Sequence, residues 1–129
     1  MSIGLGDAAA LMAMDPRIRT SGRLHSSLVH VSLTSTANTL LLTAPDGATL
    51  WLYAIWVYNR NSANVNLTLG TGSTLTQVVP QLGPFLTNFN DIVVLPPSEF
   101  ESDIYVTSSA GAAASSDVLV KAYTMAVGG

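Results

Sequence analysis

The residues that could carry out chemistry are few, and most of them lack the partners that catalysis needs. The chain has two histidines, His25 and His30, and no cysteine. Thiolate nucleophiles, disulfides, thiolate zinc sites and iron–sulfur clusters are therefore excluded. Ser26 and Ser27 follow His25, but the Gly-x-Ser-x-Gly elbow of serine hydrolases is absent. Two histidines five residues apart match no usual zinc spacing. We expect no enzyme, no metal site and no cofactor.

Three carboxylates form the one chemical cluster that sequence spacing brings together. Glu99, Glu101 and Asp103 occupy every second position, so a strand here would place all three on one face, about 7 Å apart. Like charges in a row need water, a cation or a basic partner. Three interpretations stay open: a solvated edge that discourages unwanted strand pairing, a docking site for arginines, or a calcium site.

Candidate arginines lie near the start of the chain. Three of the five basic residues, Arg17, Arg19 and Arg23, fall within residues 1–27. We expect this segment to be an extended arm that can hold one short helix over Asp7–Met14. Arginine binds carboxylates in a bidentate manner, so the arm is a candidate for contacting a neighbouring subunit or a capsid surface. A simply solvated arm is the alternative.

The remaining residues, 28–129, must supply the elements that position these groups, and their pattern predicts β structure. Short apolar or alternating runs are separated by turn signals about every ten residues, such as Pro45-Asp46-Gly47. Expected strands cover residues 28–33, 38–44, 49–59, 64–69, 75–79, 85–87, 92–95, 100–107 and 118–127, with a break at Pro96-Pro97. We expect an all-β antiparallel sandwich of eight or nine strands. The jelly roll is favoured because it protects strand edges with two packed sheets.

The strand over residues 49–59 is the most informative because both of its faces are apolar. Strict alternation would place Trp56 and Tyr58 on one face, and Trp51 and Tyr53 on the other. One face should fill the sandwich. The other needs cover from the chain's own loops or arm, from a second subunit, or from a ligand.

Composition narrows the classes of function. Apolar residues make up 48% of the 129 residues and charged residues only 10%, which is too apolar for a disordered chain. No apolar run reaches the roughly 18 residues of a membrane span, and a net charge of −3 argues against a nucleic-acid binder. A surface with so little charge repels its neighbours weakly. We therefore expect a protein that packs against copies of itself or a partner.

A resemblance appears over residues 42–70, where a proline–glycine turn, a long strand, an Asn-rich turn, an alternating strand and a glycine follow one another. This succession resembles small β-sandwich, jelly-roll-like virion accessory proteins of tailed phages, such as head decoration or cement proteins, and residues 95–106 fit the same picture. The resemblance covers roughly residues 38–127 and carries no catalytic residue. It implies a structural protein, commonly a homotrimer, that binds the major capsid protein and stabilises the shell.

These observations lead to one expectation and one alternative. We expect a virion protein, assembled in the host cytoplasm, with no nucleic-acid or membrane partner. Its candidate interface residues are Arg17, Arg19, Arg23, Trp51, Tyr53, Trp56, Tyr58, Glu99, Glu101 and Asp103. The alternative is a carbohydrate- or receptor-binding β-module of a phage fibre or tail, in which the aromatic residues of the long strand stack on sugar rings.

Overall fold

The computed structural model describes residues 23–25, 30–109 and 117–128, and within these ranges the chain forms strands and turns with no helix. Most of the predicted arm, including Asp7–Met14, lies outside the described residues. The strands are β1 (Arg23–Leu24), β2 (Val31–Leu33), β3 (Thr39–Leu42), β4 (Ala48–Asn59), β5 (Val65–Thr71), β6 (Thr76–Gln77), β7 (Leu82–Phe85), β8 (Asn90–Phe100), β9 (Ile104–Ser108) and β10 (Val118–Gly128). The long strand expected over residues 49–59 is confirmed by β4.

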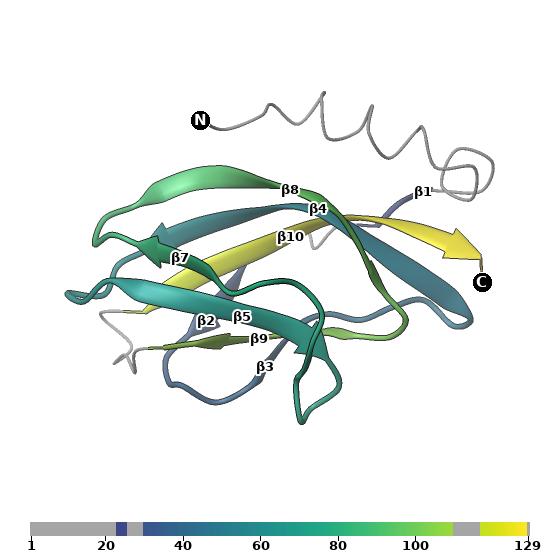
Figure 1. Cartoon of the computed structure of the whole chain (residues 1–129), viewed down its shortest axis with the longest axis horizontal. Helices are drawn as coiled ribbons and strands as arrows, with labels where there is room; N and C mark the ends of the chain where they lie inside the picture. Colours follow the sequence, from purple (N-terminus) through teal and green to yellow (C-terminus); the bar gives the residue numbers. More distant parts are fainter. Residues whose placement is uncertain (1–22, 26–29, 110–116, 129) are drawn as a thin grey trace.

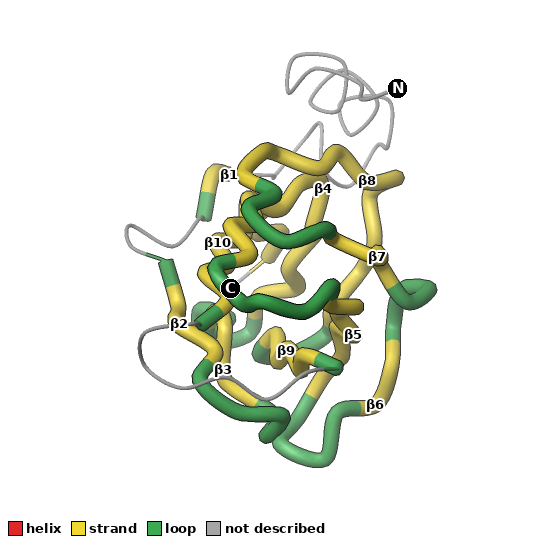
Figure 2. Tube along the Cα trace, turned by 90° about the vertical axis from the view of Figure 1, so that its left-hand side faces the viewer, coloured by secondary structure: helices red, strands yellow, loops and turns green. Residues whose placement is uncertain are grey.

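The strands form two antiparallel sheets of five strands each, packed face to face (Figure 1). Sheet A has the order β1-β10-β4-β8, with β2 also paired to β10. Sheet B has the order β3-β9-β5-β6, with β7 also paired to β5. Figure 2 shows β4 and β8 in one layer and β5, β6 and β9 in the other. The predicted all-β sandwich is confirmed.

Two pairs of short strands lie end to end along one longer partner. Leu24 of β1 pairs with Met125 of β10, and Val31 of β2 pairs with Val120 further along the same strand. In the same way, β6 and β7 pair with opposite ends of β5. Each pair therefore acts as one interrupted strand at the edge of its sheet.

The core lies between the two sheets and follows the period of two in the sequence. In β5, Val65, Leu67 and Leu69 are fully buried while Asn66 and Thr68 are partly exposed, as expected for a strand with one wet face. Among the described residues, the largest fully buried side chain is that of Phe100, at the end of β8. Burial of these side chains supplies the main favourable term for folding.

The predicted break at Pro96-Pro97 is wrong, because β8 continues through both prolines to Phe100. Proline has no backbone N–H to donate, so it is tolerated on an edge strand. Strand β8 is such an edge, since β4 is the only described strand that pairs with it. The pairing is irregular at this point: Leu52 is opposite Ser98, whereas Ala54 is opposite Val94.

A buried asparagine organises the turn between β4 and β5. Asn59 is fully buried, and its amide donates hydrogen bonds to the carbonyls of Ala63 and Phe85, each at 3.0 Å. Its side-chain oxygen accepts the backbone N–H of Asn61 at 2.9 Å. Because Phe85 belongs to β7, this one side chain joins sheet A, the turn and sheet B. Both donor hydrogens of the buried amide and its oxygen are thereby satisfied.

Candidate interaction surface

The face of sheet A that points away from sheet B, termed the outer face, gathers all four aromatic residues of β4. Strict alternation would have split them, but β4 contains a bulge at Tyr53: Leu52 pairs with Thr124 and Ala54 with Tyr123. One extra residue moves every later side chain to the opposite face. The side chains that enter the core are Leu50, Leu52, Ile55 and Val57, so the outer face receives Trp51, Tyr53, Trp56 and Tyr58.

One part of this face, termed the Trp56 half, combines aromatic and polar groups. The indole N–H of Trp56 donates to the side-chain oxygen of Asn90 at 2.7 Å. The rings of His30 and Tyr58 lie 5.9 Å and 6.3 Å from the Trp56 ring, centroid to centroid. Across the strands, Trp56 pairs with Lys121 of β10 and Ile92 of β8. Trp56, Tyr58 and Ile92 are only partly buried, so this half presents a partly exposed surface of aromatic and apolar side chains.

The other part, termed the Trp51 half, is more deeply buried. Trp51 and Tyr53 are only 9% and 7% exposed. The side chains packed against their cluster are Val94, Tyr123, Met125, Val127 and Ile92, which borders both halves. The rings of Tyr53 and Tyr123 lie 6.5 Å apart. Burial raises the pKa of the Tyr53 hydroxyl above its ordinary value, and the neighbouring Tyr123 adds to the rise. The hydroxyl of Tyr53 therefore stays neutral to a higher pH than that of an ordinary tyrosine.

The three acidic residues do not form a row on one strand. Strand β8 ends at Phe100 and β9 begins at Ile104, so Glu101 and Asp103 lie in the connection between the two sheets. The carboxylate of Asp103 accepts the backbone N–H of Ala44 at 3.0 Å, which gives it a structural role.

Glu99 remains on β8, opposite Trp51 of β4. Glu99 and Glu101 together line a hollow of about 260 Å³ with Thr71 and Val78. Of the predicted acidic cluster, the structure thus brings two members to one hollow and separates the third.

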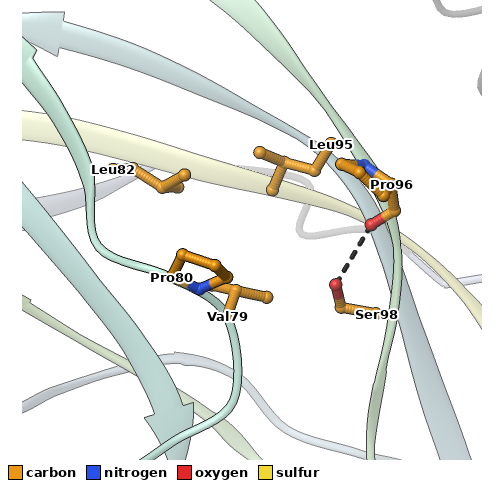
Figure 3. Close-up of a pocket in the computed structure, with 6 residues that line it drawn as sticks. All are labelled: Val79, Pro80, Leu82, Leu95, Pro96 and Ser98. Atoms are coloured by element: carbon orange, nitrogen blue, oxygen red, sulfur yellow. Dashed lines mark hydrogen bonds between the residues drawn. The ribbon is translucent and has the colours of Figure 1, made fainter.

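A second hollow, of about 220 Å³, opens at the edge of the sandwich between β8 and the segment that leads into β7 (Figure 3). Its lining is mostly apolar and comes from Val79, Pro80, Leu82, Leu95, Pro96 and Ser98. The hydroxyl of Ser98 donates to the carbonyl of Pro96 at 3.0 Å (Figure 3). Pro96 and Pro97 of β8 hinder the addition of another strand at this edge. No pattern along the chain indicated the hollow.

A buried carboxylate forms an ion pair near one end of sheet A that sequence analysis missed. The carboxylate of Asp117 accepts hydrogen bonds from the Arg60 Nε at 2.7 Å and from the Ser32 hydroxyl, and Arg60 Nη2 lies 2.5 Å from the same oxygen as Nε. Burial alone would raise the pKa of Asp117, but the hydrogen bonds from Ser32 and Arg60, together with the charge of Arg60, outweigh it. The pKa therefore lies below its ordinary value.

The predicted arm is described only at its end. Arg17 and Arg19 lie outside the described residues. Arg23 is exposed on β1, where it pairs with Ala126 of β10. The next described residue after β1, His25, is anchored on both sides: its Nε2 bonds to the carbonyl of Thr43 at 2.9 Å, and its backbone N–H donates to Thr124 at 3.0 Å. The arm thus joins the sandwich at the edge of sheet A.

In ranges 23–25, 30–109 and 117–128, no group of three or more histidine or acidic side chains is placed to hold a metal ion. The same residues contain no helix long and apolar enough to cross a membrane.

Comparison of the whole sequence with protein-family models and with curated proteins gave no match. The case for a function therefore depends on the outer face, the fold and the composition.

Proposed function

We propose that the protein is a non-enzymatic structural protein of a virion: a decoration (cement) protein that binds the outer surface of a tailed-phage head. The observation that carries the proposal is the Trp56 half of the outer face. There, Trp56, Tyr58 and Ile92 form a partly exposed apolar surface on neighbouring strands of sheet A. Partly exposed aromatic and apolar side chains that gather on one face are suited to protein–protein contacts, and large aromatic residues dominate the energy of such contacts.

The jelly roll is part of this proposal. Counting β1 with β2 and β6 with β7 as single interrupted strands gives eight strands. Their order is then 1-8-3-6 in sheet A and 2-7-4-5 in sheet B. This order supports a jelly roll, in which eight strands wound as two Greek keys divide between two packed sheets.

In this proposal, the sandwich acts as a rigid block that bridges parts of a shell. The Trp56 half forms contacts between three copies or with the major capsid protein. Arginines of the arm that stay exposed, such as Arg23, add contacts to carboxylates of neighbouring subunits. A trimer that binds several capsid subunits at once gains avidity from individually weak contacts, which is how such a protein would stabilise a shell.

The self-association in this proposal is tested by the solution mass of the full chain. Light scattering should give about 40 kDa, three times the 13.5 kDa of one chain. Ile92→Arg places a charge on the Trp56 half and should yield a monomer, because a buried unpaired charge opposes association. Thr74→Arg adds the same charge to an exposed turn of sheet B and should remain trimeric. A monomeric wild type, or equal masses for both variants, would contradict the trimer.

The virion location needs a separate experiment. A gold-labelled antibody against the purified protein should decorate the heads of virus particles released by the source cells, as seen by electron microscopy. Labelling of tails or fibres would favour the alternative below, and particles without label would exclude the virion assignment.

The alternative, a carbohydrate-binding module, is favoured by one observation. Trp56 is flanked by Tyr58, His30 and Asn90, a mixture of ring faces and polar groups that suits sugars. If it holds, a glycan identified on an array should change the tryptophan fluorescence of the wild type. Trp56→Phe should abolish this response, because the only other tryptophan, Trp51, is buried. A fluorescence response that survives Trp56→Phe would rule out this platform.

A further inference from the structure

The Trp51 half of the outer face is buried although no described strand lies over it. Sheet B packs against the opposite face, and in Figure 1 no labelled strand lies on the outer side of β4 and β8. Trp51 and Tyr53 are nevertheless 9% and 7% exposed. Trp56 and Tyr58, on the same face of the same strand, are more exposed. Large aromatic side chains on an uncovered sheet face stay partly exposed, so the Trp51 half requires an occupant that the Trp56 half lacks.

The chain itself offers a segment beside this half. Twenty-two residues precede Arg23, and β1 pairs with the end of β10 that carries Met125, the cross-strand neighbour of Trp51. The bonds of His25 to Thr43 and Thr124 fix this point of departure. Within the preceding residues, 8–14 are all apolar, namely Ala-Ala-Ala-Leu-Met-Ala-Met. An apolar segment that starts at the border of an apolar face has a short path to it.

The carboxylate of Glu99 and the reach of the residues that precede Leu24 both agree with this placement of the segment. Leu24, Met125, Trp51 and Glu99 pair in succession across β1, β10, β4 and β8, so Glu99 lies three strand spacings, roughly 14 Å, from Leu24. Arg19 precedes Leu24 by five residues, which reach up to roughly 17 Å when extended. An arginine of the same chain can therefore reach the carboxylate at the far border of the Trp51 half.

We propose that residues 1–22 of the same chain cover the Trp51 half, with the apolar residues 8–14 in contact with the aromatic side chains and an arginine near Glu99. This inference goes beyond the proposed function: it assigns Arg19 to Glu99 of the same chain and leaves Arg17 and Arg23 for contacts with neighbouring subunits. It leaves the Trp56 half as the open part of the outer face. The side of the segment that points away from the sheet remains available for contacts with a neighbouring subunit.

The two tryptophans, one in each half, allow a direct test in the full-length protein. In a Trp56→Phe background, Trp51 is the only tryptophan, and its quenching by acrylamide should be weak. Adding Leu11→Glu and Met14→Glu places charges in the apolar segment and should raise the quenching constant at least threefold, with a red-shifted emission. The matched control, Ser2→Glu with Ser21→Glu, adds the same charge outside residues 8–14 and should leave the quenching weak.

The reciprocal background, Trp51→Phe, reports on Trp56, whose quenching should not respond to Leu11→Glu and Met14→Glu. Far-UV circular dichroism should show the same strand content for all variants. Unchanged Trp51 quenching in the Leu11→Glu, Met14→Glu variant would overturn the proposal. Quenching of Trp51 that weakens with rising protein concentration would also overturn it, because the cover would then come from a second copy. Neither result bears on the mass of the Ile92→Arg variant, so the two proposals can fail separately.

Discussion

Replacing Asn59 by aspartate should lower the free energy of unfolding by about 4 kcal/mol, the largest single effect expected in this chain. The amide of Asn59 donates to Ala63 and Phe85 from a fully buried position. Aspartate has the same shape but no donor, so both carbonyls lose their hydrogen bond, at about 1–3 kcal/mol for each buried unsatisfied group. It also places a carboxylate against two carbonyl oxygens in a site with little water, which adds to the cost.

Urea unfolding at pH 7, followed by circular dichroism, measures this loss for the purified protein. Asn59→Ala should cost about 3 kcal/mol, since it removes the same donors without adding a charge. The matched control is Asn64→Ala in the same turn, where the exposed side chain accepts one long hydrogen bond from Thr87, at 3.3 Å. This control should change stability by less than about 1 kcal/mol. A similar loss for Asn64→Ala and Asn59→Asp would show that the turn as a whole, and not the buried amide, is being measured.

The fold class was predictable because its signal is local. Alternation in β5 and turn signals such as Pro45-Asp46-Gly47 need only a few neighbouring residues to be recognised. The faces of β4 were not predictable, because the bulge at Tyr53 depends on its pairing with Tyr123 and Thr124, some seventy residues later in the chain. A strict period of two thus placed the four aromatic residues of β4 on two different faces, whereas in the structure all four lie on the outer face.

The candidate surface was predictable only in part, for the same reason. Trp56 and Tyr58 stand out by residue type, but their neighbours His30, Asn90 and Lys121 come from other parts of the chain and have no distinctive spacing. The predicted row of Glu99, Glu101 and Asp103 was wrong because the alternation in sequence extends past Phe100, where β8 ends and the chain passes from sheet A to sheet B. Patterns along the chain therefore indicated candidate residues by type, while strand register decided which of them meet.

Removing the Asp117 carboxylate should cost about 3 kcal/mol at pH 7, the second large effect expected. The Asp117 side chain is 4% exposed and accepts hydrogen bonds from Arg60 and Ser32, two residues from different parts of the chain. Asp117→Ala leaves both donors without this acceptor, and breaking a buried ion pair costs about 3–5 kcal/mol. The lower end applies here, because Arg60 is 42% exposed and water screens part of its charge.

The pH dependence of this loss tests its electrostatic origin. Because the pKa of Asp117 is lowered in the folded protein, its ionised form stabilises the fold above the unfolded-state pKa of about 3.9. That contribution disappears as the pH falls through the lowered, folded-state pKa. The difference in unfolding free energy between wild type and Asp117→Ala should therefore stay constant from pH 7 to 5 and shrink below about pH 4. Asp46→Asn, in an exposed turn, should leave stability at pH 7 within about 0.5 kcal/mol. If burial instead outweighed the hydrogen bonds, protonation would stabilise the wild type, and the difference would widen as the pH fell from 7 to 4.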